Sequence, residues 1–104
     1  MAWVYLFFAG LLEIVWAFAM KLSDGFTHLV PSVITITAML GSISLLALAM
    51  RSLPLGTAYL IWTGIGAVGA FLAGVLLLGE AFTPLRAVAA MLIISGIVAM
   101  KLSH

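Results

Sequence analysis

Four long runs of apolar residues, separated by short polar segments, make up most of the chain. The runs cover approximately residues 2–20, 29–50, 57–78 and 84–102. Each run has about the 20 residues that an α-helix needs to cross the ~30 Å hydrocarbon core of a bilayer. The pattern predicts an all-α integral membrane protein with four transmembrane helices in one domain, residues 1–104. The short connections make neighbouring helices antiparallel.

Helix-capping residues and prolines agree with these boundaries. Pro31 lies in the first turn of the second run, where a missing amide hydrogen costs little. Thr57 is predicted to cap the third helix. Thr83 is predicted to cap the fourth, with Pro84 as its first residue.

Composition narrows the class of protein. The chain has 104 residues, of which 66% are hydrophobic and 7% are charged, and no soluble domain of this size covers that much apolar surface. The absence of cysteine excludes disulfides and thiolate metal sites, and no cofactor is expected. A net charge of +1 provides no basic surface for nucleic acid. The first run is expected to be a structural helix and not a signal peptide, because it carries an acid and lacks a charged beginning.

That acid, Glu13, is the only charged residue in the interior of a run. At 1.5 Å per residue it lies roughly 16 Å from Ala2, near the middle of the bilayer. An ionised carboxylate at that depth costs at least ~2.5–3.5 kcal/mol and requires a partner, water or a proton. Glu13 is therefore predicted to bind protons and a cation, the alternative being a protonated packing residue.

The remaining charged side chains lie in loops or near the ends of the runs, where the plain interpretation is anchoring at the membrane surface. Arg51 and Lys101 fall on the side of the termini, and Lys21 and Arg86 on the opposite side. Because the two sides carry equal numbers of Lys and Arg residues, the positive-inside rule predicts no preferred orientation of the chain in the membrane. Two interpretations remain: a weak bias selects one orientation, or chains insert both ways and pair antiparallel.

Oligomerisation has further support. Four helices can hardly enclose an aqueous pocket, and the interiors of the runs contain no basic partner for Glu13. Small residues provide faces for close helix packing. Ala89 and Gly96, seven residues apart on the fourth run, are predicted to form dimer contacts.

Helical spacing places Gly10, Trp16 and Ala17 beside Glu13, at offsets of three and four. Gly10 and Ala17 are expected to leave space next to the carboxylate, and Trp16 offers an indole N–H and an aromatic face. An aromatic face also stabilises a bound cation.

The second and third runs add further candidates for the site. Met39 and Ser42 share a stripe on the second run, and Tyr59 and Trp62 lie on the third. The alternatives are that the two aromatic residues form an interfacial belt and that Ser42 bonds its own helix backbone.

Glycines weaken the third run. Gly64 and Gly66 lie in its interior, where each glycine costs up to about 1 kcal/mol relative to alanine. Two interpretations fit equally well: close helix packing, or a hinge that bends between two conformations.

These residues together resemble the small multidrug resistance transporter family over essentially the full chain. The matching residues are Gly10–Ala17, Lys21, Gly25–Thr27, Pro31–Ser32, Ala58–Tyr59, Ile61–Trp62 and Gly64–Gly66. The guanidinium-exporter subtype is the most similar, on the basis of Gly10, Trp16, Ala17, Met39, Ser42, Ala67 and Lys101. Leu60 departs from the family, which usually has a small residue there, and is expected to alter the portal or the substrate range.

The resemblance implies an antiparallel homodimer in the bacterial inner membrane, with both copies of Glu13 facing one pocket. It also implies proton-coupled export of guanidinium and of small substituted guanidinium or quaternary ammonium cations. Protons and the cation would compete for the carboxylates, with Ser42 and Trp16 holding Glu13 in register and Tyr59 linking the pocket to the next helix.

Three other readings remain. The first is a broad-specificity quaternary ammonium or multidrug exporter of the same fold, and the second is a passive, dual-topology ion channel. The third is an accessory membrane subunit. An enzyme is not expected, because the sequence has no nucleophile–base pair or metal-ligand spacing, and His28 and His104 lie in a loop and at the terminus.

Overall fold

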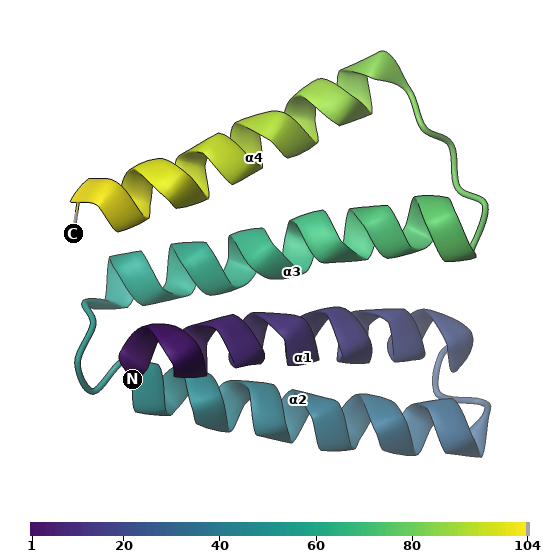
Figure 1. The fold of residues 1–104 in the computed structure, drawn as a ribbon. Coiled ribbons are helices and arrows are strands. Elements are labelled where there is room, and N and C mark those ends of the chain that lie inside the picture. The colour runs from purple at the N-terminus through teal and green to yellow at the C-terminus, as the bar shows by residue number, and fades with distance from the viewer. Residues whose placement is uncertain (104) are drawn as a thin grey trace.

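The computed structural model describes residues 1–103, which form four α-helices joined by short loops (Figure 1). The helices are α1 (Ala2–Leu22), α2 (Leu29–Ala49), α3 (Leu55–Leu77) and α4 (Pro84–Ser103). All four are long and apolar enough to cross a membrane. Only helices satisfy their own backbone hydrogen bonds in lipid, which explains why the apolar runs map onto them directly. The prediction of four transmembrane helices is confirmed.

Most of the predicted helix starts agree with the structure. Pro31 lies in the first turn of α2, and Pro84 is the first residue of α4. The backbone N–H of Arg86 donates to the Thr83 hydroxyl at 3.2 Å, so Thr83 caps α4 as predicted.

The start predicted for α3 is wrong. The helix begins at Leu55, and the carbonyl of Pro54 accepts a hydrogen bond from the Ala58 N–H at 3.0 Å. Thr57 therefore lies within the first turn of the helix and cannot cap it. The Thr57 hydroxyl instead lies 3.8 Å from the sulfur of Met100 on α4.

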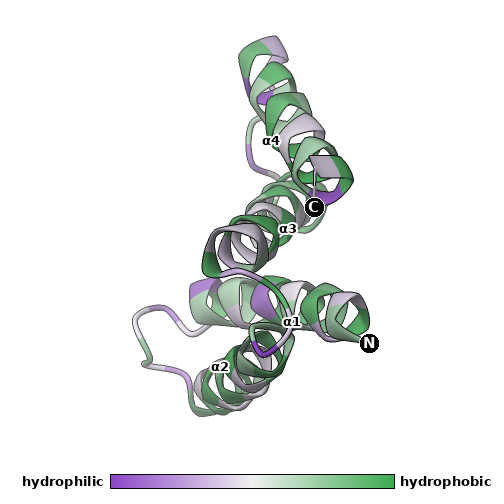
Figure 2. Ribbon diagram, turned by 90° about the vertical axis from the view of Figure 1, so that its left-hand side faces the viewer, coloured by the Kyte–Doolittle hydropathy of each residue, from purple (hydrophilic) through white to green (hydrophobic). Residues whose placement is uncertain are grey.

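The helices are arranged unevenly around α1. Helix α1 packs against both α2 and α3, whereas the backbone of α4 neighbours only α3 within the described chain. Figure 2 shows α4 extending from α3 on the side away from α1 and α2. A further link joins the two ends of the chain, since the ammonium of Lys101 lies 5.5 Å from the ring centre of Trp3.

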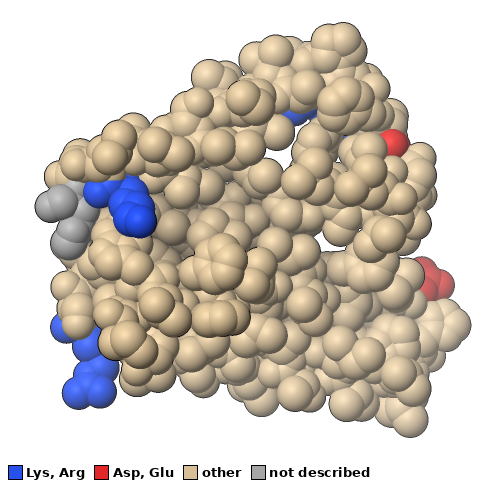
Figure 3. Space-filling view, viewed as in Figure 1, with Lys and Arg blue, Asp and Glu red and all other residues tan. Residues whose placement is uncertain are grey.

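The buried core lies between α1, α2 and the first half of α3. It consists of Leu6, Ala9, Leu46, Ala49, Leu53, Ala58 and Ile61. By contrast, none of the residues of α4 is buried. Figure 3 shows the charged side chains near the two ends of the helices, with an uncharged belt between them. This distribution is the one that a bilayer requires.

Candidate functional site

Glu13 lies in the middle of α1, on the side that faces α3. Its carboxylate rests against the backbone of Gly66, and a β-carbon at Gly66 would overlap both the Oε1 and Cδ atoms of Glu13. Gly66 is itself buried. The acid therefore fits between the two helices because position 66 carries no side chain.

Two buried polar side-chain atoms have no hydrogen-bond partner among residues 1–103: Oε1 of Glu13 and Nε1 of Trp16. They are three residues apart on one face of α1. A buried polar atom without a partner costs about 1–3 kcal/mol, so such an atom requires an explanation, such as a functional role or a bound ion or water. Here an acceptor and a donor lie on one face of the same helix, one turn apart, which suits a ligand or an exchangeable proton.

A hydrogen-bond chain beside this site joins three helices. The indole N–H of Trp62 on α3 donates to the Ser42 hydroxyl at 2.9 Å, and this hydroxyl donates to the Ala9 carbonyl of α1 at 2.6 Å. Ser42 is completely buried on α2. It thus bonds neither its own helix backbone nor Glu13 in this conformation. Because its single hydrogen is given to Ala9, Ser42 holds Trp62 and α1 in place.

Tyr59 extends this arrangement on α3. Its ring centre lies 5.6 Å from that of Trp62, and the two rings are inclined at 47°. Tyr59 is half-exposed. It contacts Trp62, and Trp62 in turn donates a hydrogen bond to the buried hydroxyl of Ser42. The structure thereby places three of the predicted site residues in one contact chain.

The expectation for Gly10 is wrong. A β-carbon there would lie 2.6 Å from Cγ2 of Ile65, so the space at Gly10 is filled by that side chain and not left for the carboxylate. Ala17 does border open space, in a hollow described below. Met39 is half-buried on α2.

Gly64 and Gly66 make close contacts in α3, a helix that is continuous from Leu55 to Leu77. A β-carbon at Gly64 would lie 2.8 Å from two atoms of Ile97 on α4. In this conformation Gly64 and Gly66 serve close packing, and bending at these positions stays a prediction.

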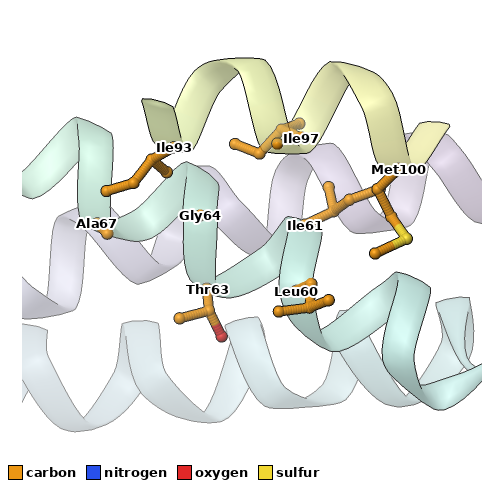
Figure 4. A pocket seen from close by; sticks show the side chains of 9 residues that line it. Leu60, Ile61, Thr63, Gly64, Ala67, Ile93, Ile97 and Met100 are labelled. Atoms are coloured by element: carbon orange, nitrogen blue, oxygen red, sulfur yellow. The ribbon is translucent and has the colours of Figure 1, made fainter. Parts of the chain in front are cut away.

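An apolar groove of about 370 Å³ separates α3 from α4. In Figure 4, Ile61, Gly64 and Ala67 of α3 face this groove together with Ile93 and Ile97 of α4. The predicted residues Leu60 and Gly96 also line it, and Leu60 is exposed.

Both predicted dimer-packing residues lie on the side of α4 that borders the hollows next to α3. Ala89 and Gly96 are exposed, and no atom lies within 4 Å of where a β-carbon at Gly96 would be.

A second hollow, of about 400 Å³, lies between α1 and α3. Its inner end is lined by Ala17, one turn beyond Glu13, and by Ala67, the neighbour of Gly66. Its outer end is lined by Lys21 and Glu80. Sequence reasoning assigned Glu80 to the membrane surface only and missed its place at this hollow. The signal available was the pair of glycines at positions 74 and 79, which allow the chain to fold back over the end of α3.

The family model of the Small Multidrug Resistance protein matches residues 1–94. The chain belongs to the small multidrug resistance family. Guanidinium exporters of Citrobacter freundii, Salmonella typhimurium and Escherichia coli (strain K12) are each 57% identical to it over 103 residues, 99% of this chain and 98% of theirs. These findings confirm the family resemblance. As a small multidrug resistance protein with four such helices, the chain is a multi-pass membrane transporter.

Proposed function

We propose that this chain exports guanidinium across the bacterial inner membrane in exchange for protons, with Glu13 of two antiparallel copies binding either protons or the cation. The observation that carries the proposal is the pair of unpartnered atoms at mid-membrane, Glu13 Oε1 and Trp16 Nε1. The names of relatives at 57% identity support the choice of cation.

Guanidinium suits two facing carboxylates. It is planar and always charged, and its N–H groups donate paired, charge-assisted hydrogen bonds to carboxylate oxygens. The faces of Trp16 and of nearby aromatic rings offer additional stabilisation to a cation. The indole N–H of Trp16 can donate to a carboxylate oxygen that the cation does not use.

Two features of the single chain support the pairing of two copies: the exposed surface of α4 and the single acid at mid-membrane. Helix α4 buries none of its residues, and its small residues Ala89 and Gly96 are exposed at hollows beside α3, where a partner helix has room to pack. One copy supplies only one acid at mid-membrane, whereas a bidentate grip on guanidinium from two sides needs two. The even distribution of Lys and Arg between the two sides allows inverted copies to pair.

Exchange follows from competition for the same oxygens. Guanidinium binds when both carboxylates are ionised, and protons displace it because protonated acids no longer offer two charges. If the dimer switches between its inward-open and outward-open conformations only when protons or the cation are bound, a proton gradient drives the cation outward. Ser42 would act by positioning Trp62 and α1, and Tyr59 by continuing this contact to the next turn of α3.

Solid-supported-membrane currents on reconstituted protein test the proposal. Guanidinium jumps should give saturating currents that reverse with the proton gradient, and Glu13→Gln should abolish them while Asp24→Asn, an exposed loop acid, should not. The proposal is overturned by proton-coupled guanidinium currents that persist in Glu13→Gln.

The same measurement separates the other readings. Larger currents with bulky quaternary ammonium cations than with guanidinium would indicate a multidrug exporter. Currents that do not saturate and do not respond to pH would indicate a channel.

A further inference from the structure

The chain folds back on itself directly after α3. Gly79 adopts the left-handed conformation with φ of +70°, and the backbone N–H of Glu80 donates to the Gly74 carbonyl at 3.0 Å. The two residues are six apart, one more than in a Schellman motif, and the left-handed glycine directly after the C-cap residue is a common way for a helix to end. The turn brings Glu80 back toward the helix that it has just left.

The side chain of Glu80 lies on the surface of α3 as a result. A β-carbon at Gly74 would lie 2.5 Å from Oε1 of Glu80 and 2.9 Å from its Cδ. Gly74 is buried and lines the hollow between α1 and α3. The absence of a side chain at position 74 thus gives the Glu80 carboxylate its place at the mouth of this hollow.

The hollow leads from that mouth toward Glu13. Its inner end is formed by Ala17, one turn from Glu13, and by Ala67, which follows the glycine that touches the Glu13 carboxylate. Phe18 and Phe71 contribute aromatic side chains to its lining. A cation that enters here meets the Glu80 carboxylate first and then aromatic and apolar walls, and it reaches the inner end of the hollow one helical turn from Glu13, which does not itself line the hollow.

We propose that Glu80 forms an outer cation site, which binds guanidinium at the mouth of the hollow before the cation reaches Glu13. The inference rests on the proposed function and adds an access route to it. A carboxylate at the opening of a low-dielectric cleft concentrates cations there and raises their rate of association. Lys21 lines the same mouth, and its positive charge limits how tightly a cation is held, so that the cation moves on.

Guanidinium uptake into proteoliposomes tests this role, with Glu80→Gln compared to Asp24→Asn. Both substitutions remove one exposed carboxylate from the same end of the helices, but Asp24 does not line the hollow. Loss of Glu80 should raise the half-saturating guanidinium concentration about 3- to 10-fold and weaken its dependence on salt, with the maximal rate within about twofold of wild type. Asp24→Asn should behave as wild type, and Glu80→Asp should retain the salt dependence.

Equal behaviour of Glu80→Gln and Asp24→Asn overturns the inference, as does a lower maximal rate with an unchanged half-saturating concentration. Absence of guanidinium uptake by the wild-type protein would instead overturn the proposed function, so the two failures are distinguishable.

A second pair of variants tests the placement of the carboxylate. Gly74→Ala pushes the Glu80 side chain out of its position, whereas a β-carbon at Gly56, also on α3, meets no atom within 4 Å. Gly74→Ala should raise the half-saturating concentration in the same direction as Glu80→Gln, and Gly56→Ala should not. A wild-type value for Gly74→Ala contradicts the proposed location of the site.

Discussion

The carboxylate of Glu13 on α1 occupies the space that a β-carbon at Gly66 of α3 would fill. The acid and the third helix are thus in direct contact at mid-membrane. Any rotation or tilt of α3 changes the wall against which the carboxylate rests. This contact provides a physical link between what Glu13 binds and how α3 is positioned, which is what a transporter with two conformations needs.

Gly66→Ala is expected to reduce guanidinium binding at least about tenfold, because the added carbon displaces the carboxylate from its position, and a tenfold loss corresponds to about 1.4 kcal/mol. The helix itself should not be weakened, since alanine favours helix by up to about 1 kcal/mol over glycine. Isothermal titration with guanidinium measures the effect, and Gly56→Ala, where the new carbon meets open space, is the control. Equal affinities of the two variants would show that the contact does not matter.

Ser42→Ala removes the link between Trp62 and Ala9. It leaves the Trp62 N–H without its partner and frees α1 from α2 at this point, at an expected cost of about 0.5–2 kcal/mol in the free energy of unfolding. Guanidinium transport should become less strongly dependent on the proton gradient, because Trp62 and α1 lose their fixed positions beside Glu13.

Ser44→Ala is the matched control for this change. Ser44 is exposed on the same helix and donates only to the Leu40 carbonyl of its own backbone. Unfolding in detergent and pH profiles of transport measure both variants. A wild-type pH profile for Ser42→Ala would argue against its positioning role.

Gly96→Leu is expected to weaken dimer formation and leave the single chain intact. A β-carbon at Gly96 meets no atom of its own chain within 4 Å, and the groove that Gly96 lines beside α3 has room for a longer side chain. Ser95→Leu adds an apolar side chain to the neighbouring, exposed position of the same helix. Energy transfer between labelled chains diluted in bilayers should fall for Gly96→Leu alone. Equal transfer in both variants would place the dimer contact elsewhere.

The four helices could be predicted from the sequence because a helix that crosses a bilayer must have about 20 apolar residues. Pro31, Thr83 and Pro84 were also interpreted correctly, since their effects act within one turn. Thr57 was not, because the preceding proline already lets the helix start at Leu55.

Contacts between helices were less predictable. The approach of Ile65 to Gly10 depends on how α1 and α3 are rotated about their axes, which the pattern of either helix alone does not determine. The Ala9 carbonyl, which accepts the Ser42 hydroxyl, is a backbone atom and has no mark in the sequence. Glu13 was recognisable because a lone acid in an apolar run is costly wherever its partners lie.

Competition between protons and guanidinium is the central claim, and equilibrium binding over a pH series in detergent-solubilised or liposome-reconstituted protein tests it most directly. Deprotonation frees the Glu13 carboxylates for the cation, so affinity for guanidinium should rise with pH and level off once both acids are ionised. Each bound cation should release protons in the range where affinity changes. An affinity that stays constant across the series, with no proton release, would contradict the account.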